Sequence, residues 1–218
     1  MNFSERSAAQ MKLVGERLCL DFVNTVGGWY PDPARPRSDP YAAVARADKL
    51  NDYFDLLAWS LHTKLLGESV AHALAREAGR RDKEAARTLD RAVALRRAIY
   101  RICAAIIHGA RPRASDLDLL NQELNVAHGQ VHLGAGDGNL VWEWTDEKNA
   151  LDRMLWRIAD SAAEMLTTDD LARLRGCPGE NCGWMFLDIS KNGRRQWCDM
   201  QDCGNLAKVR RFRQRQSS

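Results

Sequence analysis

Two cysteine pairs near the end of the chain decide its organisation: Cys177-Pro-Gly-Glu-Asn-Cys182 and Cys198-Asp-Met-Gln-Asp-Cys203. Four residues lie between the cysteines of each pair, and fifteen residues separate the pairs. Spacings of about two to four residues are typical of structural zinc sites, in which four thiolates leave no position for water or substrate. The alternatives are two disulfides, which need an oxidising compartment, or four free thiols. The spacing therefore predicts one structural Zn²⁺ bound by Cys177, Cys182, Cys198 and Cys203.

The residues around the cysteines predict how this centre is built. Cys177-Pro178-Gly179 is typical of the tight turn of a zinc knuckle, and residues 184–187 are predicted to form a strand. A turn with Asn-Gly at its tip leads to a predicted return strand over residues 194–197. Asp202-Cys203-Gly204-Asn205 then opens a helix. A knuckle, a hairpin and a helix that carries the last ligand follow the order of a treble-clef finger.

This stretch resembles the zinc finger named after its C-G-N-R motif, found at the C-terminus of bacterial stress-induced transcription regulators. The matching residues are Cys177-Pro178, Cys182-Gly183-Trp184, Phe186-Leu187-Asp188, Ser190, Asn192-Gly193-Arg194-Arg195, Trp197-Cys198, Met200, Cys203-Gly204-Asn205 and Ala207-Lys208. One position departs from the pattern, because the family's arginine after Gly-Asn is Leu206 here. Any DNA contact that this arginine makes is therefore missing.

A second match lies near the N-terminus, in Leu18-Cys19-Leu20-Asp21-Phe22-Val23-Asn24-Thr25. It resembles the L-D-F-V-N-T opening of the ABATE domain, which precedes the finger in the same family. The resemblance implies an ABATE-like, mainly helical domain over residues 1–175 and a zinc finger with a basic C-terminal helix over residues 176–218. Asp21 and Asn24 either bind a ligand or tie this segment to the body, and the second interpretation is favoured.

The positive charge of the chain is concentrated in the finger. The whole sequence has 32 Lys and Arg against 29 Asp and Glu, whereas residues 177–218 hold eight basic and four acidic residues. The chain is long enough to bury a core, with 218 residues of which 45% are hydrophobic. No apolar run approaches the roughly 18 residues of a membrane span, and the N-terminus lacks a signal-peptide pattern. We therefore expect a cytoplasmic protein without a membrane partner.

Helical periodicity dominates the body. Apolar residues recur every three or four positions over residues 82–108, which predicts the longest helix. Further helices are predicted to start at Asp52, Ser69, Ser115 and Thr145, where polar side chains can act as caps.

A β-hairpin and a loop complete the expected body. Residues 130–133 and 140–144 flank a glycine-rich tip and predict the hairpin, whereas the proline-rich residues 27–40 predict an irregular loop. The expected fold class is therefore α+β, with a mostly helical N-terminal domain that contains a β-hairpin, followed by a treble-clef-like zinc finger.

Other candidate groups in the body favour structural roles. Arg96 and Arg97 either bind an anionic ligand or pair with carboxylates, and ion pairing is favoured. Cys19 and Cys103 are expected outside the metal site, as small buried hydrophobic residues. The five histidines lack metal-ligand spacing, and no nucleophile lies beside a base in a recognisable motif, so we do not expect an enzyme.

The C-terminal helix carries the functional prediction. The candidates for DNA contact are Arg194, Arg195, Asn205, Lys208, Arg210, Arg211, Arg213 and Arg215. Lys208, Arg211 and Arg215 share one helix face, and a charged face on a rigid element suits phosphate contacts. We therefore expect a zinc-dependent transcription regulator that binds double-stranded DNA, either as a homodimer or through a second contact. A small-molecule or protein effector would act on the N-terminal domain. The alternative is a zinc-finger adaptor that binds protein or RNA.

Overall fold

The computed structural model describes residues 2–31, 43–145 and 149–216. The helices are α1 (Leu18–Val23), α2 (Tyr53–His62), α3 (Glu68–Arg80), α4 (Asp82–Ile107), α5 (Ala114–His128), α6 (Arg153–Thr167) and α7 (Asn205–Gln216). Three antiparallel strand pairs join β1 (Val26–Pro31) to β2 (Ala43–Asp48), β3 (Val131–Ala135) to β4 (Leu140–Trp144), and β5 (Leu174–Gly176) to β6 (Met185–Leu187). Short 3-10 turns are η1 (Ser7–Gln10) and η2 (Asp169–Arg173), and η3 (Met200–Gly204) is a π-helical turn before α7. The α+β class is confirmed.

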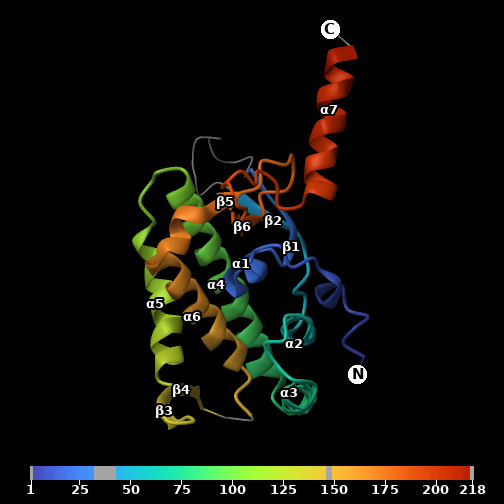
Figure 1. The fold of residues 1–218 in the computed structure, drawn as a ribbon. Helices are drawn as coiled ribbons and strands as arrows, with labels where there is room; N and C mark the ends of the chain where they lie inside the picture. Colours follow the sequence, from blue (N-terminus) through green and yellow to red (C-terminus); the bar gives the residue numbers. More distant parts are fainter. Residues whose placement is uncertain (1, 32–42, 146–148, 217–218) are drawn as a thin grey trace.

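The hydrophobic core is built mainly from α1, α2, α4 and α6, with further residues from α3, α5 and the strands. Helices α4, α5 and α6 run side by side (Figure 1). The predicted long helix is confirmed as α4, and Leu95, Ile99 and Ile102 on its inner face are buried. Gly109 follows with a φ of +69°, a left-handed conformation that ends helices at low steric cost. Segment Leu18–Thr25 has no clear periodicity, and its first six residues, Leu18–Val23, form the short helix α1.

Three predicted helix starts are wrong. Helix α3 begins at Glu68, so Ser69 lies inside it and is not its cap. Helix α5 begins at Ala114, so Ser115 is not its cap, and the Asp116 carboxylate turns inward to accept a 2.8 Å hydrogen bond from Arg101 Nε. Helix α6 begins at Arg153 rather than after Thr145. The Thr145 amide instead donates to the Gln130 carbonyl oxygen at 2.8 Å, which extends the β3–β4 hairpin. The start predicted at Asp52 is confirmed, because its carboxylate accepts from the Asp55 amide.

The loop predicted over residues 27–40 is wrong as far as Pro31, where the structure has strand β1; residues 32–40 lie outside the described part of the chain. The sequence signal that indicates strand β1 is the aromatic pair Trp29-Tyr30 within the glycine- and proline-rich stretch. Trp29 is buried and stacks on Tyr100 of α4, with 3.8 Å between ring centroids. Across the β1–β2 strand pair, the guanidinium of Arg46 lies over the Tyr30 ring, 4.6 Å from its centroid.

The finger is built onto the body through strand β6. Met185 and Leu187 of this strand are buried in the same hydrophobic core as the helices. The side chain of Asn24 donates to the Met185 carbonyl and accepts from its amide, both at 2.9 Å. The predicted tying role of Asn24 is thus confirmed, and the contact joins the first helix of the chain to the finger.

The return strand predicted over residues 194–197 is wrong, because β6 pairs with β5 instead. The carboxylate of Asp188 accepts hydrogen bonds from the Ser190 and Arg195 amides, both at 3.0 Å. These bonds hold residues 188–195 in a turn that the Asp188 side chain organises. They also occupy the Arg195 amide, which pairing with a neighbouring strand would need. The treble-clef arrangement stays a prediction.

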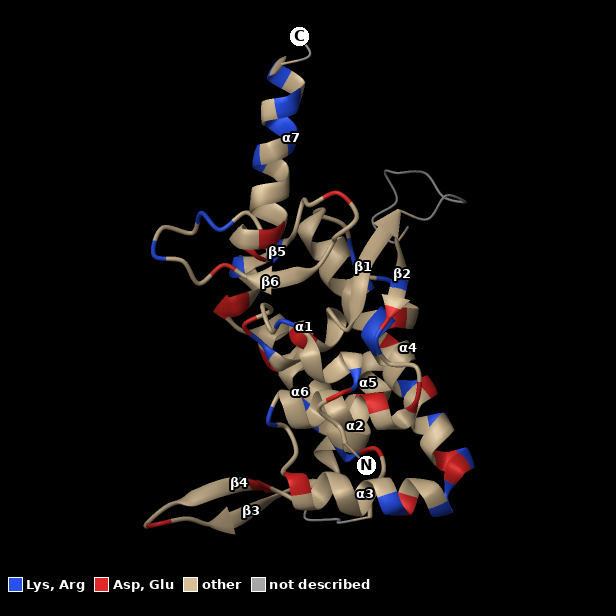
Figure 2. Cartoon of the chain, turned by 90° about the vertical axis from the view of Figure 1, so that its right-hand side faces the viewer, with Lys and Arg blue, Asp and Glu red and all other residues tan. Residues whose placement is uncertain are grey.

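Helix α7 extends away from the body, at the end of the molecule opposite the β3–β4 hairpin (Figure 1). None of its described residues is buried. Figure 2 shows basic residues and no acidic ones along the ribbon of α7. Among the described helices, none is long and apolar enough to span a lipid bilayer.

Candidate metal centre

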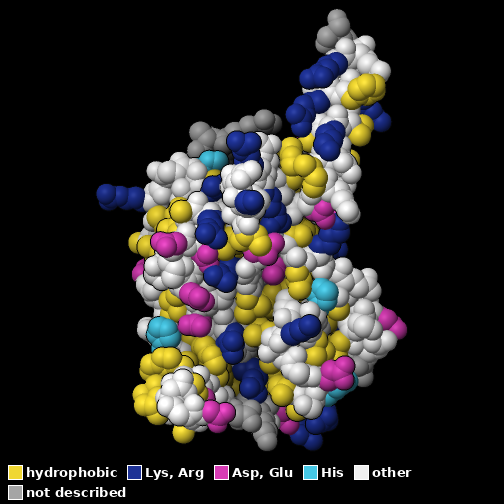
Figure 3. All heavy atoms as spheres, in the orientation of Figure 1, with side chains coloured by type: hydrophobic (Ala, Val, Ile, Leu, Met, Phe, Trp, Pro, Cys, Tyr) yellow, Lys and Arg dark blue, Asp and Glu magenta, His cyan; other side chains and the backbone are white. Residues whose placement is uncertain are grey.

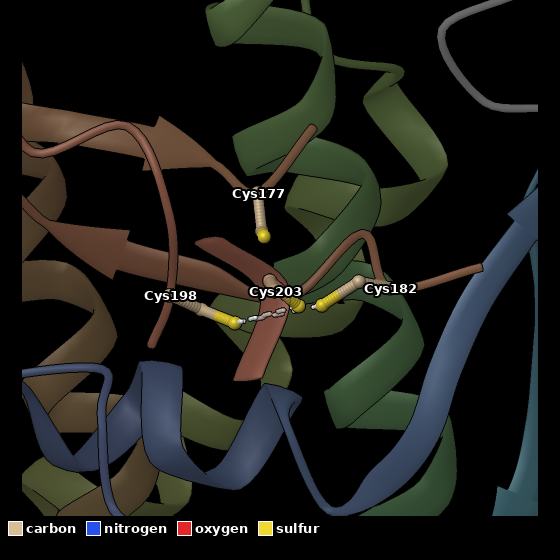
Figure 4. A group of neighbouring side chains, drawn as sticks. All are labelled: Cys177, Cys182, Cys198 and Cys203. Carbon is tan, nitrogen blue, oxygen red and sulfur yellow. Dashed lines mark hydrogen bonds between the residues drawn. The ribbon is translucent and has the colours of Figure 1, made fainter. Parts of the chain in front are cut away.

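The four predicted ligands converge on one point, and their side chains turn toward one another (Figure 4). All four Sγ atoms lie within 4.8 Å of one another. The Sγ atoms of Cys182 and Cys198 are 3.6 Å apart, and those of Cys198 and Cys203 are 3.7 Å apart. A tetrahedron of sulfur atoms around Zn²⁺ at about 2.3 Å has edges of about 3.8 Å. The cysteine set therefore fits one tetrahedral Zn²⁺.

Local backbone geometry brings the sulfur atoms this close. A Cβ atom on Gly179 would lie 3.0 Å from the Cys203 sulfur, so only glycine fits the knuckle without displacing a ligand. The Cys182 amide donates to the Gly179 carbonyl at 3.0 Å, which closes the turn. The Cys177 amide donates to the Trp184 carbonyl at 2.8 Å and fixes the knuckle to strand β6.

The thiols form one coupled electrostatic group. Hydrogen bonds from Cys182 and Cys198 lower the pKa of Cys177 to about 2, with smaller help from backbone amides. The hydrogen bond to Cys177 raises the pKa of Cys182 to about 12, and that of Cys198 is raised for the same first cause. Four thiolates this close repel one another, and a divalent cation is the group that allows all of them to ionise. With four protein ligands the site is closed and structural.

Arg195 holds this centre against the N-terminal segment. Its guanidinium donates to the backbone carbonyls of Cys198 at 2.7 Å and Val14 at 2.9 Å, and to the Glu16 carboxylate at 3.1 Å. It also lies 4.4 Å from the ring centroid of Phe186, a fully buried residue beside the cysteines. The planar fork of an arginine suits such simultaneous bonds, which a lysine cannot reproduce.

Strand β1 supplies a second support. The Trp29 amide donates to the Cys182 carbonyl at 2.8 Å, and the Trp184 indole donates to the Val26 carbonyl at 2.9 Å. A Cβ atom on Gly28 would lie 2.4 Å from the Asn181 carbonyl oxygen. The knuckle is thus packed directly on β1, and no local sequence signal predicts that this strand lies beside it.

Comparison with known families supports this construction. A family model described as ABATE, "Putative stress-induced transcription regulator", matches residues 16–169, and the CGNR zinc finger model matches residues 173–216. The chain belongs to the ABATE family. Both matched families are regulator or zinc-finger families and not enzyme families. A search of curated proteins gives no match. One structural Zn²⁺ in the CGNR finger is consistent with both the family and the four clustered cysteines.

The structure distributes the predicted DNA-contact residues over three settings. Arg194 is exposed on the turn of the CGNR finger, whereas Arg195 is engaged at the metal centre as described above. Asn205 is exposed at the start of α7, and its amide donates to the Gln201 carbonyl at 3.0 Å. The five remaining residues are exposed along α7: Lys208, Arg210, Arg211, Arg213 and Arg215.

The neighbouring arginines allow a matched test of the Arg195 contacts. Arg195→Ala is expected to lower the free energy of unfolding by about 2–4 kcal/mol, because it leaves buried carbonyls without donors. Arg194→Ala removes the same charge from an exposed site and is expected to stay within about 0.5 kcal/mol of the parent. Urea denaturation with zinc content measured in parallel checks both values. Equal effects of the two substitutions would contradict the anchoring role.

Proposed function

We propose that this ABATE-family chain is a transcription regulator that binds double-stranded DNA through the exposed basic face of α7. One combination of features supports this proposal: the start of the finger is fixed to the body, and the helix α7 that follows it is exposed. Zinc, Arg195 and strand β1 hold the start of the CGNR finger to the body, while α7 extends from it into solvent (Figure 1).

The charges of α7 are arranged for a polyanion. Its sequence from Asn205 to Gln216 contains no acidic residue. Within the described part of the chain, Lys208, Arg211 and Arg215 form no ion pair, and they recur at i, i+3 and i+7 on one face. Arg210 is directed differently, because it pairs with Glu180 of the knuckle. Three or four cations on a rigid helix are suited to contact successive phosphates.

The salt dependence of binding tests this assignment. If about four phosphates are neutralised, the plot of log K against log salt concentration should have a slope near −3.6. Arg211→Ala/Arg215→Ala is expected to reduce the slope by about two, because two counterions fewer are released. Fluorescence anisotropy with a labelled duplex measures the slope, and zinc content should stay constant.

A matched control distinguishes DNA binding by the basic face of α7 from binding that depends on net charge alone. Arg76→Ala/Arg80→Ala removes the same charge from exposed positions on α3, at the far end of the body from α7 (Figure 1). Its slope should equal that of the parent protein. A selection from random duplex DNA should also enrich a sequence motif. If both double variants lower the slope equally, net charge rather than the α7 face determines binding and the proposal fails. If no motif is enriched, α7 is a general polyanion-binding end and the proposed regulator role fails as well.

A protein-binding adaptor is the second candidate, and a separate feature of α7 favours it. Leu206, Val209 and Phe212 form an exposed apolar stripe on another side of the helix, and Figure 3 shows apolar and basic side chains on the same projecting element. Binding of such a partner would depend little on salt and strongly on Phe212. The slope of the Arg211/Arg215 variant therefore distinguishes the two candidates.

The remaining parts of the proposal concern the ABATE domain. An effector could use the surface hollow of about 650 Å³ beside η1, α2 and α3, which Phe3, His62 and His72 line. A homodimer would present two α7 helices to one duplex, as DNA with repeated half-sites requires. The protein would act in the cytoplasm, where zinc thiolates stay reduced, and the proposal includes no catalytic step.

A further inference from the structure

The β3–β4 hairpin has one entirely apolar face. Its register places Val131 opposite Trp144, Leu133 opposite Trp142, and Ala135 opposite Leu140. Directly opposed residues of an antiparallel pair project from the same side, and residues two apart along a strand do so as well. All six side chains therefore share one face, which we name the hairpin face. It contains no charged or hydrogen-bonding group except the two indole N–H groups.

The opposite side of the hairpin carries His132, Gly134, Val141 and Glu143, and Val141 is its one large apolar residue. His132 lies opposite Glu143, with 3.7 Å between the imidazole Nε2 and the carboxylate. The Glu143 carboxylate also covers Gly134, where a Cβ atom would lie 2.1 Å from it. A strand pair with one polar and one apolar side is the pattern of a sheet with one side buried. In this hairpin neither side has a buried residue, so the apolar side faces solvent.

Much of the hairpin face is exposed in the single chain. Leu133 exposes 55%, Leu140 69% and Trp142 71% of its accessible surface. Apolar side chains gather at this end of the molecule in Figure 3. Three side chains of this size expose roughly 350 Å² together, which is within the range of patches that mark interaction sites. Within the described residues, the base of the face contacts the body, where Arg157 lies 5.3 Å from the centroid of the Trp144 ring.

We propose that the hairpin face binds the hairpin face of a second copy of this chain. Two such faces would remove about 700 Å² of apolar surface from water before Val131, Ala135 and Trp144 are counted. With these residues and the strand edges, the contact reaches the roughly 1,000 Å² that a specific interface needs. An isolated two-stranded hairpin is marginal in water, and packing on a second hairpin gives it the missing layer.

Symmetry and charge favour a second copy over a different partner. A two-fold axis brings the same residues of both copies together. The hairpin face has no charge that would repel the hairpin face of the second copy. The hairpin extends sideways from the lower body in Figure 2, whereas α7 extends from the opposite end of the molecule. A two-fold axis parallel to α7 would therefore place both α7 helices on the same side of the dimer. Dimerisation through the hairpin face rests on the homodimer of the proposed function and assigns its interface, but it does not require DNA binding.

The test is the mass of the full-length, zinc-loaded protein in solution. Sedimentation equilibrium at micromolar concentrations should give twice the 24.6 kDa of one chain. Leu140→Ser/Trp142→Ser is expected to raise the dimer dissociation constant on the order of 100-fold or more, because a buried tryptophan is a typical centre of binding energy. Both residues are exposed in the single chain, so far-UV circular dichroism and zinc content should not change.

Two controls make the result specific. Val141→Ser alters the opposite side of the same hairpin, and Phe212→Ser alters the exposed stripe of α7. Both should leave the dissociation constant within about threefold of the parent value. A monomeric parent protein, or a double variant that dimerises as tightly as the parent, would overturn the proposal. Dissociation caused by Phe212→Ser alone would assign the interface to α7 and would overturn it equally.

Discussion

Cys198→Ser protein is expected to lose its zinc and at least about 5 kcal/mol of its free energy of unfolding. Structural zinc contributes apparent binding energies of about 10–16 kcal/mol in small fingers, comparable with the entire stability of a domain. The loss should not stay within the finger, because Met185 and Leu187 belong to the core of the helical body. We therefore expect the body to become less stable as well.

Elemental analysis and urea denaturation followed by tryptophan fluorescence measure both consequences. Cys103→Ala is the matched control, because it removes a buried thiol from α4 at the cost of packing alone. This control should keep one zinc ion per chain. Full zinc occupancy in the Cys198 variant, or an unfolding curve equal to that of the parent, would contradict the assignment of Cys198 as a ligand.

The second large effect is expected at Asp48. Its carboxylate pairs with the fully buried guanidinium of Arg96, which also donates to the Thr25 hydroxyl at 2.9 Å. Asp48→Ala leaves a buried cation without its counter-charge and should cost about 3–5 kcal/mol. The predicted preference for ion pairing over ligand binding is confirmed for Arg96 by this contact. The pair also joins β2 to α4, and so supports the strand on which β1 lies.

Thermal and chemical unfolding of three variants separate the causes. Arg97→Ala removes an exposed arginine from the neighbouring position and should change stability by less than about 0.5 kcal/mol. Asp48→Leu/Arg96→Met removes both charges and should recover a large part of the loss, because no unpaired ion remains. A double variant as unstable as Asp48→Ala would show that packing rather than charge dominates.

The same pair makes stability depend on pH. Burial raises the pKa of Asp48, but the hydrogen bonds and charge of Arg96 outweigh burial, and the pKa is lowered in the folded state. A lowered carboxyl pKa means that the unfolded chain binds the proton more readily, so stability falls as the pH falls below about 4. Between pH 3 and 5, roughly, the Asp48→Ala protein should therefore show a shallower pH dependence than the parent.

Local chemistry explains which features the sequence could predict. The zinc ligands are set by cysteine spacing, and α4 by apolar periodicity over its whole length; both signals lie within one continuous segment. The β3–β4 hairpin follows from alternation around a glycine-rich tip. These predictions needed no knowledge of distant contacts.

Contacts between distant segments explain the errors. Strand β6 pairs with β5 across the knuckle, and nothing in the sequence distinguishes this partner from the residues after the Asn-Gly turn. Arg194 and Arg195 are adjacent and chemically identical, yet only Arg195 reaches Val14 and Glu16 at the other end of the chain. Their separate roles depend on the folded N-terminal segment. From local sequence alone, both arginines are therefore predicted to contact DNA.

The strand shared between finger and core also limits how the two parts can be recombined. A peptide starting at residue 177 would keep all four ligands but lose β5 and Asn24, and Met185 and Leu187 would face water. We expect such a peptide to bind zinc and still aggregate. If this segment with α7 were transferred to another protein, that protein would have to provide an apolar surface that covers Met185 and Leu187. The last 42 residues are therefore not an independently transferable unit.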